Sequence, residues 1–305
     1  MKIVFFGAGD FAFPIAKKIA QDFVLQGVVV TKPRPRGRGR SVTLPEISRW
    51  AQEQGIPVFA PDKPDDAHFI ESVSGYAPDL FVLSAYGHIL GGDVLRIPKY
   101  GGVNIHPSLL PQYRGAAPIQ RALLAGETKT GVTIIFMDEK VDHGKIVFKQ
   151  EVAIEPQDNY GSLTARLSSV ATEAISNTIN SIASGSYKVV EQDHTHATYA
   201  PKIKKEEMVI DWRLSTEEII GLIRALSPKP CARTHFRGRT LKIIAAEPGE
   251  KSQEPGTVHV EHKKLYIGTG NGSIVVRTLQ PENRAAISGL DFINGFRIRE
   301  GEAIG

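Results

Sequence analysis

The sequence lacks several features that mark special classes of protein. It holds one cysteine, Cys231, among 305 residues, so it can form no internal disulfide and no cluster of thiolate zinc ligands. Its longest apolar runs, such as residues 80–83, are far shorter than the roughly 20 residues that a membrane-spanning helix needs. The start MKIVFFGAGD favours a strand over a signal peptide, and the scarcity of cysteine predicts a reducing, cytoplasmic location.

The composition also excludes disorder and fibrous repeats. Hydrophobic residues make up 41% and charged residues 23%, which is typical of globular chains. A length of 305 residues predicts about two domains, at roughly 150 residues each. The formal net charge of +4 is small, so its distribution carries more information than its size.

Basic residues gather in one short segment, residues 32–40, which reads KPRPRGRGR and contains no acid. Its prolines and glycines exclude a helix or a central strand and predict an exposed loop. A loop of this charge density favours phosphate oxyanions, as in nucleic acid or a polyphosphate, over a solvated connector. Its candidate ligand-binding residues are Lys32, Arg34, Arg36, Arg38 and Arg40.

The first 185 residues show strands alternating with helices. Strands are expected at 2–6, 23–31, from 58, and at 79–85, 101–106, 131–137 and 144–152. Helices are expected at 11–20, 44–55, 65–74, 117–125 and 162–183. This order predicts a Rossmann-like α/β domain with a mostly parallel sheet over 1–185.

The remaining chain has a different character. Residues 186–205 are polar and are interpreted as a linker. Ser215 and Glu218 form a capping box for a helix that ends at 226, and Asn271-Gly272 signals a hairpin. Short strands expected at 241–246, 257–261, 264–267 and 273–279 predict a smaller OB-like β-barrel domain over 206–305.

The turn Gly7-Ala-Gly9 after the first strand fits the start of a dinucleotide-binding motif. The acid that such a site needs at the end of the second strand is missing, because Thr31, Lys32 and the basic loop stand there. A tight turn that lines another pocket is favoured, and an NADP-dependent oxidoreductase stays open as an alternative.

Asn104 and His106 stand two apart on an expected strand, so their side chains leave the same face at its carboxyl end. An amide and an imidazole side by side can stabilise the oxyanion of acyl transfer, although a structural Asn and a core His fit the same pattern. Asp142 lies in a loop past a later strand and can orient His106; Asp138 is its rival. No metal site is expected, because the pairs His194/His196 and His259/His262 lack thiolates or a zinc-binding frame.

Residues 104–134, NIHPSLLPQYRGAAPIQRALLAGETKTGVTI, followed by MDEKVDHGKIV, resemble the formyltransferases that use 10-formyltetrahydrofolate. The loop 32–40, the stretch 197–212 and the C-terminal residues 279–296 resemble, within that superfamily, the methionyl-tRNA formyltransferase family. The resemblance runs through the whole chain.

This resemblance implies formyl transfer to the α-amine of methionyl initiator tRNA in translation initiation, with 10-formyltetrahydrofolate as donor and no metal. It implies that Asn104, His106 and Asp142 are catalytic, that the loop residues from Lys32 to Arg40 contact tRNA, and that the C-terminal barrel holds the tRNA body. It implies folate binding by Ser108, Leu109, Leu110, Pro111 and Tyr86. His143 departs from the small hydroxyl residue usual in the family. A formyltransferase of an aminosugar or nucleotide amine and a non-catalytic RNA-binding protein remain alternatives.

Overall fold

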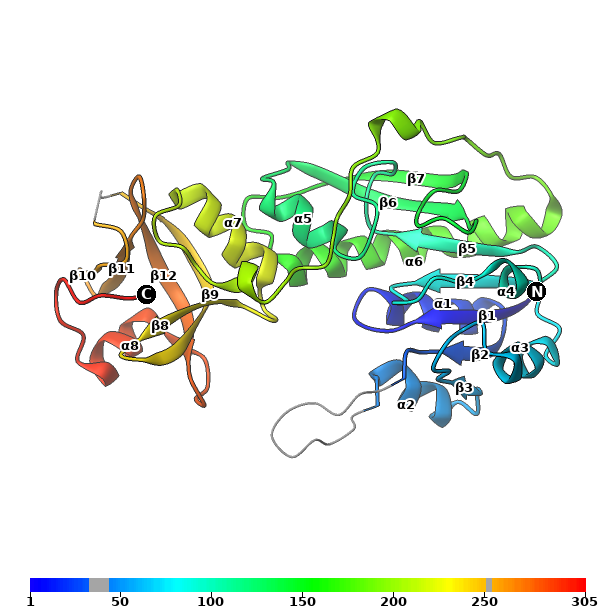
Figure 1. Ribbon diagram of the computed structural model, residues 1–305, viewed down its shortest axis with the longest axis horizontal. Helices are drawn as coiled ribbons and strands as arrows, with labels where there is room; N and C mark the ends of the chain where they lie inside the picture. The colour runs from blue at the N-terminus through cyan, green and yellow to red at the C-terminus, as the bar shows by residue number, and fades with distance from the viewer. Residues whose placement is uncertain (33–43, 251–253) are drawn as a thin grey trace. The chain divides into compact units, whose positions relative to one another are not determined.

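The computed structural model describes residues 1–32, 44–250 and 254–305 (Figure 1). The chain divides into two compact units, each built from more than one segment. The first unit holds Met1–Pro118, Lys129–Ala153 and Thr164–Pro201, and the second holds Ile119–Thr128, Ile154–Leu163 and Lys202–Gly305. Residues 186–201, expected in a linker, therefore group with the first unit.

The first unit is built on a seven-stranded sheet with the order β3-β2-β1-β4-β5-β6-β7. The pairings from β3 to β5 are parallel, whereas β6 and β7 run antiparallel to their neighbours, which confirms the expected mostly parallel sheet. Its strands are β1 (Lys2–Gly7), β2 (Val24–Val29), β3 (Val58–Phe59), β4 (Leu80–Ser84), β5 (Gly102–His106), β6 (Lys129–Phe136) and β7 (Ile146–Ala153).

Six helices accompany these strands along the chain. They are α1 (Ala12–Asp22), α2 (Glu46–Glu53), α3 (Ala67–Ser74), α4 (Gly92–Leu95), α5 (Pro118–Leu124) and α6 (Tyr160–Ser184). The apolar stripe expected on α6 is buried, as Leu167, Ile175 and Ile179 show by their complete loss of exposure. The Ser168 hydroxyl donates to the Phe11 carbonyl over 2.8 Å and so ties α6 to the start of α1.

The strand order changes direction between β1 and β4, and open α/β sheets bind ligands outside the carboxyl ends of the strands at such a point. Gly7 ends β1 there, with φ +150°, and a Cβ on it would lie 1.8 Å from the Ser84 carbonyl oxygen. Gly9 has φ +91° and open space around its Cβ position. The close approach of β1 and β4 therefore accounts for the first glycine without any dinucleotide.

We expect Gly7→Ala to lower the free energy of unfolding by about 3 kcal/mol or more, because the added methyl group forces β1 and β4 apart. Gly9→Ala is the matched control, and it should cost only the roughly 1–2 kcal/mol of a left-handed alanine. Urea unfolding of both variants measures the difference. Equal losses for the two variants would contradict the packing role of Gly7.

The second unit contains a six-stranded antiparallel sheet with the order β10-β11-β12-β9-β8 and β13 paired to β12. This confirms that a smaller β domain follows the α/β domain. The bridges Val209–Arg233 and Thr257–Ala303 extend its two edges. Its strands are β8 (Ala232–Phe236), β9 (Arg239–Gly249), β10 (Val258–Glu261), β11 (Lys264–Gly268), β12 (Ser273–Pro281) and β13 (Ile287–Ser288).

The helices α7 (Thr216–Leu226) and α8 (Gly289–Phe296) belong to this unit, as does α5 apart from Pro118. Short 3-10 turns span His194–His196 in the first unit and Glu206–Met208 in the second. The capping box at the start of α7 is confirmed, because the Ser215 and Glu218 side chains each bond the other's backbone N–H. The core includes Trp212, Ile219, Leu265 and Phe292, all at or below 5% exposure. The sequence pattern after β12 does not predict a helix, so α8 is an element that the sequence analysis missed.

Candidate active site

Asn104 and His106 lie on β5, near its carboxyl end, and Asp142 reaches them from the loop between β6 and β7. The Asn104 amide donates to Asp142 Oδ1 over 2.9 Å. The Nδ1 atom of His106 lies 3.5 Å from Asp142 Oδ2. The structure thus brings together the three residues that the sequence predicts to be catalytic.

The carboxylate of Asp142 is held from a third side, because the backbone N–H of Gly115 donates to its Oδ2 over 2.8 Å. Asp142 itself has the left-handed φ of +50°, a strained conformation that persists only where the surroundings impose it. On the far side of the imidazole, His106 Nε2 lies 2.8 Å from the Tyr113 carbonyl oxygen. A carbonyl only accepts, so Nε2 carries the proton there.

Two of these polar side chains are withdrawn from water, and Asn104 is partly buried. The His106 side chain is 5% exposed and that of Asp142 is 8% exposed. In such a medium, charges and dipoles act on a reacting group far more strongly than in bulk solvent. The arrangement can therefore stabilise an oxyanion and hold or move a proton on the imidazole.

The rival carboxylate, Asp138, bonds to residues of its own loop and not to the trio. Its oxygens accept from the Lys140 backbone N–H at 2.9 Å and pair with His143 Nδ1 at 2.7 Å. The His143 ring also stacks on His194, with 4.0 Å between ring centroids and 9° between ring planes. His143 therefore contacts Asp138 and His194, rather than entering between Asp142 and His106.

The residues expected to bind folate have distinct environments. The side chains of Ser108 and Leu110 are buried, the hydroxyl of Ser108 donates to the Gln112 carbonyl at 2.6 Å, and Leu109 and Pro111 are partly exposed. The Tyr86 hydroxyl is buried without a hydrogen-bond partner among the described residues, and burial raises the pKa of Tyr86 to about 12. This unpaired hydroxyl, just past β4, is free to form a hydrogen bond with a polar group of a bound folate.

Most of the basic loop cannot be compared with the structure. Lys32 is described, and its ammonium pairs with Asp62 at 2.9 Å on an exposed surface. Arg34, Arg36, Arg38 and Arg40 lie outside the described residues. Exposed ion pairs of this kind contribute at most about 1 kcal/mol, so Lys32 can exchange its partner for a phosphate.

Other candidate groups can be placed in the described parts of the chain. There, no set of three or more His, Cys, Asp or Glu side chains is arranged to hold a metal ion. No helix in residues 1–32, 44–250 or 254–305 is long and apolar enough to cross a membrane. Cys231 is buried, and burial raises the pKa of its thiol, which disfavours the reactive thiolate.

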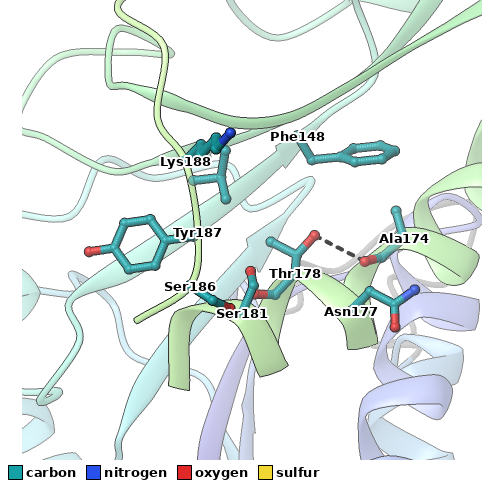
Figure 2. A pocket seen from close by; sticks show the side chains of 9 residues that line it. Phe148, Ala174, Asn177, Thr178, Ser181, Ser186, Tyr187 and Lys188 are labelled. Atoms are coloured by element: carbon teal, nitrogen blue, oxygen red, sulfur yellow. Dashed lines mark hydrogen bonds between the residues drawn. The ribbon is translucent and has the colours of Figure 1, made fainter. Parts of the chain in front are cut away.

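A separate cavity of about 300 Å³ lies beside β7 and α6 (Figure 2). Phe148, Thr178, Tyr187 and Lys188 are among its lining residues, and none of the expected site residues lines it. The Thr178 hydroxyl is already satisfied by the Ala174 carbonyl of its own helix, at 3.0 Å. This cavity therefore contributes nothing to the polar trio.

Sequence reasoning missed two buried side chains next to the trio, Arg114 and Gln192. Arg114 is 4% exposed and Gln192 is 5% exposed, and they bond each other over 2.6 Å. Arg114 belongs to the same NIHPSLLPQYRG stretch as the trio, which was a usable signal. Gln192 lies in a polar segment whose composition resembles a linker, so no local sequence pattern indicated a functional role for it.

Comparison with known proteins agrees with this geometry. A family model described as "Formyl transferase" matches residues 1–179, and one described as "Formyl transferase, C-terminal domain" matches residues 202–297. The chain is 40% identical over 309 aligned positions to a methionyl-tRNA formyltransferase of Bacillus subtilis, covering 100% of this chain and 98% of the relative.

Solved structures agree on the fold. A variant of HypX from Aquifex aeolicus superposes with a TM-score of 0.70 at 18% identity, over 98% of this chain and 48% of that one. HypX in complex with tetrahydrofolic acid superposes with a TM-score of 0.66 at 17% identity, over 97% of this chain and 47% of that one. The chain thus spans about half the length of HypX. By its full-length similarity and its two matched domains, it belongs to the formyl transferase family, and within that family to the methionyl-tRNA formyltransferases.

Proposed function

We propose that this chain is an enzyme that transfers the formyl group of 10-formyltetrahydrofolate to the α-amine of methionyl initiator tRNA, and so supports translation initiation. The observation that carries the proposal is the contact of Asn104 and His106 with Asp142, at 2.9 and 3.5 Å. Full-length similarity to a named methionyl-tRNA formyltransferase supports the choice of acceptor.

The nucleophile needs little activation. A free α-amine titrates at about 7.7–8.0, and the adjacent ester lowers that pKa, so much of the amine is neutral near pH 7. Its lone pair attacks the formyl carbon, and the carbonyl oxygen becomes an oxyanion. Collapse of this intermediate breaks the bond to N10, and the proton lost by the amine reaches N10 of tetrahydrofolate. The reaction is balanced without a metal or a redox step.

The trio divides this work among its members. The oxyanion is stabilised by the second amide N–H of Asn104, beside the one given to Asp142, and by the ring of His106, whose Nε2–H exchanges the Tyr113 carbonyl for the oxyanion. Asp142 orients Asn104 and His106 and helps to relay the proton, since it contacts both side chains. The tetrahydrofolate moiety is bound by the segment from Ser108 to Pro111 and by Tyr86, whose buried hydroxyl has a hydrogen bond to offer.

The RNA is bound by the basic loop and by the second unit. A cavity of about 330 Å³ in that unit is lined by Arg239, Arg284 and Phe296, among others. The Arg284 guanidinium lies over the Phe296 ring, 5.2 Å from its centroid. Arginines beside aromatic rings are suited to phosphates and unstacked bases of RNA.

The reaction takes place in the cytoplasm, with soluble donor and acceptor and without a stable protein partner. An aminosugar or nucleotide acceptor is the less favoured alternative. It accounts neither for five basic residues in the nine positions of loop 32–40 nor for the 40% identity to the Bacillus subtilis relative over both domains.

One assay tests the function. The chain is incubated with 10-formyltetrahydrofolate and methionyl initiator tRNA, the aminoacyl ester is hydrolysed, and N-formylmethionine is measured by mass spectrometry. We expect product that depends on enzyme and donor. Its absence, with a free aminosugar nucleotide formylated instead, would support the alternative.

Replacing Arg36, Arg38 and Arg40 together by Ala should raise KM for the tRNA and flatten its salt dependence by about three units of the log–log slope. Folate binding should be unchanged, because the proposal assigns these residues to the acceptor and not to the donor. The salt dependence is checked by measuring kcat/KM for the tRNA at a series of salt concentrations. Folate binding is checked by titration with tetrahydrofolate. An equal loss of folate binding would contradict the role of the loop.

A further inference from the structure

Gln192 is placed against the loop that carries Asp142. Val190 forms an antiparallel bridge with Ile146 at the start of β7, with backbone bonds of 2.8 and 2.9 Å. Two residues further on, the Gln192 amide donates to the carbonyl of Asp142 at 3.0 Å and to that of Gly144 at 2.8 Å. The NH₂ group of one buried amide therefore donates to two carbonyls of the same turn.

Arg114 links the Gln192 amide to the chain segment that contacts His106 and Asp142. One of its guanidinium nitrogens donates to Gln192 Oε1 at 2.6 Å and lies 2.8 Å from His194 Nδ1. The neighbours of Arg114 in the chain contact the trio through their backbones, since the Tyr113 carbonyl faces His106 and the Gly115 N–H bonds Asp142. The Arg114 side chain thus fixes the segment that touches both residues.

The turn at Asp142 needs such support. Its φ of +50° is unfavourable for a non-glycine residue. From the other side the turn is confined by Gly144, where a Cβ would lie 1.8 Å from the Phe136 carbonyl oxygen. Removing the Gln192 amide would leave two buried carbonyls without these donors, and the turn could then relax away from His106.

We propose that Gln192, held by Arg114, is a positioning residue for formyl transfer, which keeps the Asp142 carboxylate in place between Asn104 and His106. The inference rests on the proposed function, because it assigns a part in that reaction. The side chain of Gln192 bonds the backbone of the turn and the guanidinium of Arg114, so it acts on the reaction through Asp142. Its contribution is therefore to kcat, since displacement of a catalytic group by about 1 Å costs on the order of 100-fold in rate.

Two near-isosteric variants test the proposal. Gln192→Met removes both donors and the acceptor, whereas Gln192→Glu keeps an acceptor for Arg114, removes the donors to the turn and adds a negative charge. Gln150→Met, on the exposed part of β7, is the matched control for the change of side chain. For each protein, kcat, KM for methionyl initiator tRNA, tetrahydrofolate affinity and thermal midpoint are measured.

We expect both Gln192 variants to lower kcat by about 10- to 100-fold, with KM and tetrahydrofolate affinity within about twofold of wild type. Gln150→Met should match wild type. Wild-type kcat in Gln192→Glu would overturn the proposal, because the amide donors would then be dispensable. A loss of kcat together with folate affinity would also overturn it, since it would indicate a general packing role. Failure of the proposed function is distinguishable, because wild type would then form no N-formylmethionine.

Discussion

Replacing Asn104 or His106 by Ala should lower kcat for formyl transfer by about 10²–10³, because each substitution removes a donor that we propose stabilises the developing oxyanion. The effect should fall on kcat and kcat/KM alike, since the interaction is made only in the transition state. Single-turnover formylation of methionyl initiator tRNA, with saturating 10-formyltetrahydrofolate, measures it.

The controls for these variants use the same changes on exposed surfaces. Asn177→Ala on α6 and His68→Ala on α3 alter residues that are exposed and do not contact the trio. Both should turn over within about twofold of wild type, as surface substitutions usually do. Near-normal turnover of Asn104→Ala and His106→Ala would remove the trio from the mechanism.

Asp142→Asn should lower kcat by up to about 10⁴, the loss seen when the orienting carboxylate of a catalytic histidine is replaced by an amide. Donors from Asn104 and Gly115 and the ring nitrogen of His106 converge on its two oxygens. An amide offers one oxygen, so its NH₂ group must face one of these donors or the ring must turn. Stopped-flow or quenched formyl transfer, compared with tetrahydrofolate binding, detects the change.

Asp138→Asn is the matched control for this carboxylate. Asp138 lies in the same loop and contacts His143 and the Lys140 backbone, not the trio. Its variant should keep kcat within about threefold of wild type, because the loss of a partly exposed ion pair is small. If Asp138→Asn lost more activity than Asp142→Asn, the assignment of the two carboxylates would be reversed.

Local patterns predicted the trio only in part. A strand period of two residues is enough to place Asn104 and His106 on one face, because it is a property of the backbone. The approach of Asp142 depends on the antiparallel pairing of β6 with β5, which no local pattern encodes. The residues alone offered both Asp142 and Asp138 as the carboxylate, and the resemblance to a known family decided for Asp142.

The elements that were missed share a physical cause. The strand β8 reads ARTHF, and its buried positions Ala232, Thr234 and Phe236 include a small and a polar residue, so its alternation is weak. The helix α8 contains glycines at its first and seventh positions, which lowers its intrinsic helix propensity, and it is stabilised by burial of Phe292. Tertiary packing outweighs propensity in both cases.

At the site itself, the role of Gln192 likewise depends on tertiary contacts that the local sequence does not reveal. Its segment is polar and follows a long helix, as linkers do, and its role appears only when the bridge to Ile146 brings it to Asp142. Arg114 could have been found from the sequence, because it lies in the same NIHPSLLPQYRG stretch as Asn104 and His106.

The most direct test of the account offers the enzyme two acceptors at once. Labelled 10-formyltetrahydrofolate is mixed with wild-type protein, methionyl initiator tRNA and a nucleotide-linked aminosugar, and the label in each product is counted. The account predicts label on the methionine amine, lost in Asp142→Asn while tetrahydrofolate still binds. Label on the sugar amine alone, or transfer to tRNA that survives Asp142→Asn, would contradict it.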